Sequence, residues 1–113
     1  PEDLWAALET NPDGRPTLIA FSTPSCAACH TAQKPALAEL ERRLGGGVRV
    51  IHVDAAARPE AAARFGILTV PATVVLDPGG QVAAANQGFA AADRLSAQLQ
   101  PWLAESHPAP RVP

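Results

Sequence analysis

Short apolar segments of strand length alternate with segments of helical periodicity along most of this chain. The expected strands are residues 17–22, 48–53, 73–76 and 81–86, and the expected helices are residues 3–9, 26–44, 58–65 and 90–103. The last two strands flank the turn sequence Asp77-Pro78-Gly79-Gly80 and should form an antiparallel hairpin. Because strand–helix–strand units join neighbouring parallel strands, the order αβαβαββα predicts an α/β fold with a central mixed four-stranded sheet flanked by helices.

Length and charge narrow the classes of function. The chain of 113 residues suits one domain, expected over residues 1–105 and followed by a flexible tail over 106–113. A net charge of −2 and an aromatic content of 4% favour no nucleic-acid partner. No apolar run approaches the roughly 18 residues of a membrane-spanning helix. We expect a monomer, and both a cytoplasmic and an extracytoplasmic location remain open.

The two cysteines lie between a predicted strand and a predicted helix, with two residues between them. A loop this short restrains little unfolded chain, so redox chemistry or ligation explains the pair better than a structural crosslink. At a helix start, unpaired N–H groups and the helix dipole stabilise a thiolate. We therefore expect Cys26 to be the attacking thiol and Cys29, one turn later, the resolving thiol. His30 would add positive charge beside Cys26 when it is protonated.

Two other uses of the pair fit part of the sequence. Zinc usually takes four protein ligands, and the chain has two Cys, three His and no second CxxC motif. The segment from Cys26 to His30 also matches the CxxCH motif for haem attachment, in which His30 would be the axial ligand. The chain has no Met for a sixth ligand, which leaves His52 or His107. The strand-rich pattern favours the redox pair, with no metal and no cofactor other than the disulfide itself.

From Thr17 to Leu103 the assembled pattern resembles the thioredoxin family. The resemblance rests on the strand before the CxxC motif, on the segment Val70-Pro71-Ala72-Thr73, and on the turn Asp77 to Gly80 with Gly88 beyond it. It implies that Pro71 is a cis-proline lying against the cysteine pair. The backbone of Val70 would then turn towards the sulfurs, where its N–H and C=O could pair with an extended substrate segment.

The resemblance implies a thiol–disulfide oxidoreductase that acts on protein disulfides, with an external thiol reductant or oxidant as its second partner. We expect reduction rather than oxidation. The residues expected to bind substrate are Ser25, Ala27, Ala28, Val70 and Pro71. The alternative is a thioredoxin-fold module without enzymatic activity that binds a metal or a partner protein.

The chain departs from the family pattern in and behind the cysteine motif. Ser25 stands where the family usually has Trp, and Ala27-Ala28 replaces its Gly-Pro spacer. The family's buried Asp corresponds to Ala20, and the Lys that partners it corresponds to Val50. That Asp usually accepts the proton of the resolving thiol, so the proton must leave by another route. Water and Glu39 are the candidates for accepting it.

Two prolines interrupt expected helices. Pro35 lies one residue later after the second cysteine than is usual in the family, and its missing N–H predicts a kink there. Pro101 is expected to bend or end the closing helix. Together with the changes around the cysteines, the shifted Pro35 predicts a specialised thioredoxin-like protein.

Overall fold

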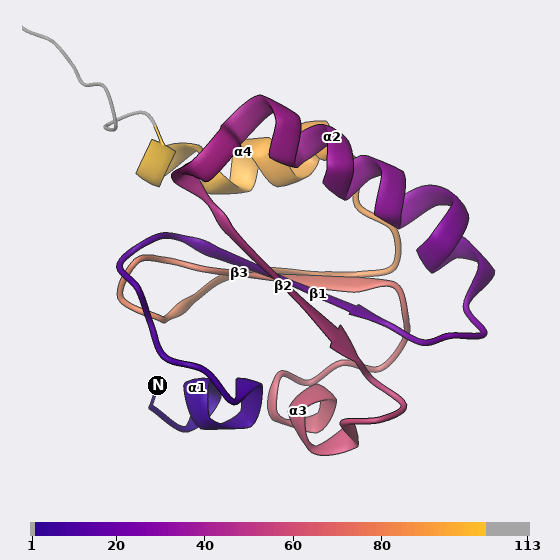
Figure 1. Cartoon of the computed structure of the whole chain (residues 1–113). Coiled ribbons are helices and arrows are strands. Elements are labelled where there is room, and N and C mark those ends of the chain that lie inside the picture. The colour runs from indigo at the N-terminus through magenta and orange to yellow at the C-terminus, as the bar shows by residue number, and fades with distance from the viewer. Residues whose placement is uncertain (1, 104–113) are drawn as a thin grey trace, which may run out of the picture.

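The computed structural model describes residues 2–103, which form one mixed sheet between two layers of helices (Figure 1). The strands are β1 (Thr17–Ser22), β2 (Arg49–Asp54), β3 (Ala72–Leu76) and β4 (Val82–Gln87). The helices are α1 (Glu2–Leu8), η1 (Cys29–Gln33), α2 (Lys34–Leu44), η2 (Gly45–Gly47), α3 (Pro59–Arg64) and α4 (Ala92–Leu103). The predicted α/β fold is confirmed. The expected boundary at residue 105 and the tail over 106–113 lie outside the described residues.

The sheet has the strand order β2-β1-β3-β4, in which β1 is parallel to β2 and β3 is antiparallel to both of its neighbours. Ser22 pairs with Asp54 and Phe21 pairs with Ala72, while Ala72 also pairs with Gln87. The carboxyl ends of β1, β2 and β4 therefore meet the amino end of β3 at one end of the sheet. We call this the cysteine end, because the segment leaving β1 there leads into the cysteine pair (right-hand side of Figure 1).

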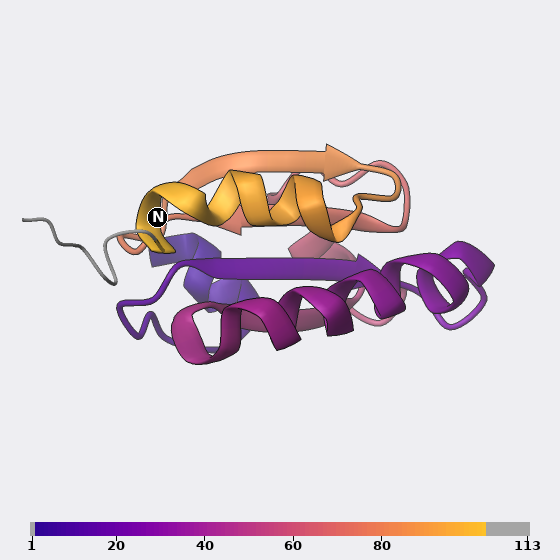
Figure 2. The same cartoon turned by 90° about the horizontal axis from the view of Figure 1, so that it is seen from above.

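The central strands bury side chains on both faces. Leu18 on β1 belongs to one apolar cluster with residues of α2 and α4, whereas Ile19 and Phe21 belong to a second cluster with residues of α1 and α3. Figure 2 shows α2 and α4 side by side over one face of the sheet. Since Leu18, Ile19 and Phe21 are each 0% exposed, β1 is a fixed base for the segment that follows it.

The cysteine helix contains an irregular turn that the sequence analysis did not locate. The helix starts at Ala27, passes through the π-helical turn η1 and continues as α2, with Pro35 in its first turn. The N–H of Lys34 donates to the carbonyl of Cys29, five residues back. A wide turn thus lies immediately before Pro35, where a kink was predicted, and it accommodates the additional residue.

Of the two outcomes expected at Pro101, an end to the helix is wrong, because α4 continues through the proline to Leu103. Leu99 and Leu103 are both buried against the sheet, and this packing holds the last turn in place. The helix also begins at Ala92, two residues later than predicted, because the backbone of Ala90 is bonded elsewhere.

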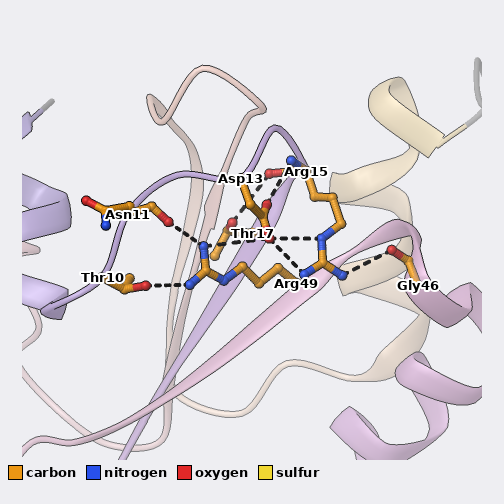
Figure 3. A network of polar contacts seen from close by, with 7 residues as sticks. All are labelled: Thr10, Asn11, Asp13, Arg15, Thr17, Gly46 and Arg49. Carbon is orange, nitrogen blue, oxygen red and sulfur yellow. Dashed lines mark hydrogen bonds and ion pairs between the residues drawn. The ribbon is translucent and has the colours of Figure 1, made fainter.

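A polar network at the end of the sheet opposite the cysteines fixes the segment between α1 and β1 (Figure 3). Arg49 at the start of β2 donates hydrogen bonds to the carbonyl of Asn11 and to Oγ1 of Thr10, each over 2.6 Å. The guanidinium of Arg49 also lies over the ring of Trp5, 5.9 Å from its centroid. Arg15 donates to the carboxylate of Asp13 over 2.8 and 3.1 Å. The network thereby ties α1 to the sheet without involving the cysteine end.

Protonation of Asp13 should weaken this network. Hydrogen bonds from Arg15 lower the pKa of the Asp13 carboxyl from its ordinary value of 3.8. A group with a lowered folded-state pKa stabilises the fold above its unfolded-state pKa, and that contribution is lost as pH falls through the folded-state value. We expect Asp13→Asn to lower Tm slightly at about pH 7 and to match the unsubstituted protein at about pH 2. Thermal unfolding followed by circular dichroism measures the difference, and an equal difference at both pH values would contradict the prediction.

Candidate active site at the Cys26–Cys29 pair

The two cysteines are joined in a disulfide at the start of the cysteine helix, with their Cα atoms 5.3 Å apart. Cys26 directly precedes the first helical residue, and Cys29 is the first residue of η1. Cys26 is half-buried, whereas Cys29 is buried with 4% exposure. The backbone N–H of Cys29 donates to Sγ of Cys26 over 3.1 Å. The more accessible sulfur therefore lies where a helix presents its N–H groups and the positive end of its dipole.

The turn before Cys26 is held from both of its ends. The N–H of Cys26 donates to the carbonyl of Thr23 over 3.2 Å, and Nε2 of His30 lies 3.0 Å from the carbonyl oxygen of Pro24. A carbonyl only accepts hydrogen bonds, so we assign the proton of this contact to Nε2. His30 thus links the first turn of the helix back to the turn that delivers the attacking sulfur. Sequence reasoning considered its charge and missed this contact.

The surface around Cys26 is small and uncharged. Ser25, Ala27 and Ala28 are all exposed there, as expected for residues that a substrate would touch. None of them carries a charge, so these three side chains add no charge that would stabilise a Cys26 thiolate, whereas the helix start does.

The Val70–Pro71 peptide bond is cis, as the family resemblance implies. Pro71 is buried, and its carbonyl accepts a hydrogen bond from Gly88 over 2.8 Å. Because Ala72 pairs with Phe21, the segment that enters β3 and the segment that leaves β1 lie at the same end of the sheet. Within residues 2–103, neither the N–H nor the C=O of Val70 has a hydrogen-bond partner. That Val70 faces the sulfurs stays a prediction.

A small cavity of about 20 Å³ lies behind the resolving cysteine, between β1, β2 and the cysteine helix. Ala20, Cys29, Gln33 and His52 are among the residues that line it. Ala20 is the position at which the family has its buried acid, and its methyl group leaves this space unfilled. A volume of this size accommodates one water molecule.

Glu39, the other candidate proton acceptor, is occupied by two arginines. Its carboxylate accepts hydrogen bonds from Arg43, over 3.0 Å, and from Arg42. These bonds lower the pKa of the Glu39 carboxyl. A carboxylate stabilised in this way is a poor acceptor for a thiol proton.

Gln33 is a buried polar residue that the sequence analysis did not single out. It is 3% exposed, and its side-chain amide forms two hydrogen bonds with the backbone of Ala90, each over 2.9 Å. The late position of Pro35 was a sequence-level indication that the helix is unusual here. The contact that Gln33 makes could not be predicted from this indication, because its partner, Ala90, lies 57 residues away in the sequence.

The metal-binding alternative gains no ligand set from the described part of the chain. Across residues 2–103, no three His, Cys, Asp or Glu side chains are grouped in a way that could hold a metal ion. Over the same residues, no helix is long and apolar enough to cross a membrane.

Residues 7–100 match the family described as TraF, F plasmid transfer operon protein. The chain belongs to the TraF family. Among its relatives, the thioredoxin of Bacillus subtilis is 29% identical over 72 residues, which cover 64% of this chain and 67% of that protein. Thioredoxin 1 of a Nostoc species is 28% identical over 88 residues, which cover 78% of this chain and 80% of that protein.

Solved structures share the fold of this TraF-family chain. Thioredoxin-2, described as a component of malaria parasite protein secretion machinery, superposes with a TM-score of 0.73 at 20% identity and covers 81% of this chain and 87% of its own. Chloroplastic thioredoxin z gives a TM-score of 0.72 at 18% identity and covers 89% of this chain and 88% of its own. The resemblance to thioredoxins is confirmed, and this TraF-family chain is, in general terms, a thiol–disulfide oxidoreductase.

Loss of the His30 contact should make Cys26 less reactive. We expect His30→Ala to slow the reaction of the Cys26 thiol with iodoacetamide about threefold near pH 7, because the turn no longer holds the sulfur at the helix start. His30→Gln keeps a side-chain N–H for the Pro24 carbonyl and lacks the imidazole ring, so it tests the hydrogen bond separately from the ring. The rates are measured in a Cys29→Ser background, where only one thiol reports. Equal rates for His30→Ala and the parent would contradict the prediction.

Proposed function

We propose that this chain reduces disulfides in protein substrates, with Cys26 as the attacking thiol and Cys29 as the resolving thiol. The observation that carries the proposal is the placement of the two sulfurs. Cys26 is partly accessible and immediately precedes a helix, and the buried Cys29 follows one turn later. A helix start favours the thiolate form of the first cysteine, which is the form that attacks disulfides.

The reaction transfers two electrons in two exchange steps. The Cys26 thiolate attacks one sulfur of the substrate disulfide, forms a mixed disulfide and releases the first substrate thiolate. The Cys29 thiolate then attacks Sγ of Cys26, releases the second substrate thiolate and leaves the Cys26–Cys29 disulfide. An external dithiol returns the pair to its reduced form and is oxidised to a disulfide. The electrons come from that dithiol, and no metal or organic cofactor takes part.

Substrate binding is assigned to the segment before the cis-proline together with the uncharged surface around Cys26. The N–H and C=O of Val70 have no partner within residues 2–103, which suits an extended substrate segment that would pair with them as an added strand. A groove of about 380 Å³ begins at Val70 and is lined mainly by apolar side chains, including those of Ala62 and Ile67. These features support a substrate segment with apolar side chains beside its cysteine, bound through Ser25, Ala27, Ala28, Val70 and Pro71.

The cavity behind Cys29 supports water as the acceptor of the resolving thiol's proton. It reaches Cys29 and the Ala20 position and is large enough for one water molecule. Glu39 is the weaker candidate, because its carboxylate is already bonded to arginines. The proton of Cys29 would pass to this water as the thiolate forms.

The direction of exchange can be measured as a potential. The alanine spacer adds no charge to stabilise the reduced pair strongly, which favours a reductase over a strong oxidant. We expect a reduction potential nearer to about −270 mV than to about −120 mV. Equilibration with glutathione or dithiothreitol buffers, read by mass spectrometry after thiol alkylation, measures this value. A potential near the upper figure would reverse the proposed direction.

The two cysteines should fail in different ways when substituted. We expect Cys26→Ser to reduce insulin disulfides no faster than dithiothreitol alone, because the nucleophile is gone. Cys29→Ser should still attack and should accumulate a mixed disulfide with the substrate, because no thiol resolves it. Turbidity measures the first result, and mass spectrometry under non-reducing conditions measures the second. Full activity of Cys26→Ser, or an adduct on Cys29 rather than on Cys26, would refute the assigned roles.

A further inference from the structure

The side chain of Gln33 holds a loop that lies far from it in the sequence. Its Nε2 donates to the carbonyl of Ala90, and its Oε1 accepts from the N–H of Ala90, each over 2.9 Å. Gln33 is 3% exposed and Ala90 is 1% exposed, so water does not reach these groups. Loss of either hydrogen bond would leave a buried polar group unpaired, which costs folding free energy. A planar amide that matches one backbone unit in both directions fixes the position of that unit as well as stabilising it.

The π turn is what places this amide at the loop. The turn η1 runs from Cys29 to Gln33, so the resolving cysteine and Gln33 are its two ends. In an α-helix without the extra residue, the side chains beyond the turn would be rotated relative to Cys29. Single wide turns of this kind occur often at functional sites.

The loop held by Gln33 is connected to the cis-proline. The N–H of Gly88 donates to the carbonyl of Pro71 over 2.8 Å, and Ala90 lies two residues further along the same loop. Between them, the side chain of Phe89 is 52% exposed. The loop is therefore hydrogen-bonded to the cysteine helix at Ala90 and to Pro71 at Gly88, and the backbone of residues 88–90 connects the two contacts.

We propose that Gln33 is a positioning residue for disulfide exchange, which sets the place of the Gly88–Ala90 loop and of Pro71 relative to the cysteine helix. The inference rests on the proposed function, because it concerns how substrate is held beside Cys26. Gln33 touches neither substrate nor the reacting sulfurs in this role. It acts through the loop, so its loss should raise KM and lower kcat/KM. The free energy lost from kcat/KM should exceed the free energy lost from folding.

Substitution by glutamate makes the role testable through pH. In Gln33→Glu, the neutral form of the new carboxyl can donate its O–H to the Ala90 carbonyl and accept from the Ala90 N–H, as the amide does. The ionised form has no donor and would face that carbonyl oxygen. We expect the kcat/KM of Gln33→Glu for insulin reduction to equal that of the unsubstituted protein at about pH 5 and to fall about tenfold below it at about pH 8. Gln33→Leu, which pairs with neither group, should be about tenfold slower at both pH values.

The kcat/KM of each variant is divided by that of the unsubstituted protein at the same pH. This ratio cancels titration that is common to all of the proteins. His30 and Lys34 on the cysteine helix and His52 on β2 line one cavity with Gln33, and they are the same in every variant. Residues 88–91 carry no titratable side chain.

Gln98 offers a matched control. Its amide makes the same kind of two-way contact, with the side chain of Asn86, over 2.9 and 3.0 Å. This pair joins α4 to β4, and none of its hydrogen bonds goes to the cysteine helix or to the Gly88–Ala90 loop. Gln98→Glu should therefore lose stability as pH rises, while its kcat/KM relative to the unsubstituted protein stays constant below the unfolding temperature.

The outcomes separate the two proposals. An unsubstituted protein that cannot reduce insulin overturns the proposed function and this inference with it. If the unsubstituted protein is active but the relative kcat/KM of Gln33→Glu does not change with pH, as expected for Gln98→Glu, the inference alone is overturned. Amide hydrogen exchange at Ala90 supplies a readout independent of activity, since protection should fall in Gln33→Leu and should fall in Gln33→Glu only at the higher pH. Unchanged protection in Gln33→Leu would also overturn the inference.

Discussion

The geometry of the site depends on a buried strand that ends where a helix begins. β1 is packed on both faces, and the turn that follows it places Cys26 directly before the first helical residue. The N–H groups of that first turn and the helix dipole then act on one sulfur, while the second sulfur is buried a turn later. Without the rigid strand, neither the direction of the helix nor the accessibility of Cys26 would be fixed.

The elements whose burial is continuous could be predicted from sequence. Strand β1 has the bounds expected for it, and the cis-proline and the cysteine helix follow from motif and order. What could not be predicted depends on contacts between distant residues. The π turn brings the Gln33 amide to Ala90, 57 residues away, and the passage of α4 through Pro101 depends on the burial of Leu99 and Leu103. Local propensity describes neither, because tertiary packing overrides it in both places.

Two of the departures from the thioredoxin pattern lie at the same place, around the cavity behind Cys29. Replacement of the buried acid by Ala20 leaves a cavity at the resolving thiol, and the additional helical residue brings a neutral amide, Gln33, to the wall of that same cavity. The buried environment of Cys29 thus contains hydrogen-bonding groups without a buried carboxylate of the family type. Having alanine in place of an acid at this position avoids the cost of desolvating a carboxylate in the interior.

The places of the two tryptophans have a practical consequence for following this protein in solution. Trp5 lies under Arg49 at the end of the sheet away from the cysteines, Trp102 is near the far end of α4, and Ser25 occupies the position next to the attacking sulfur. No indole is therefore adjacent to the disulfide to be quenched by it. Intrinsic fluorescence should report the packing of the terminal helices and change little when the disulfide is reduced. Unfolding can therefore be followed by fluorescence without interference from the redox state of the pair.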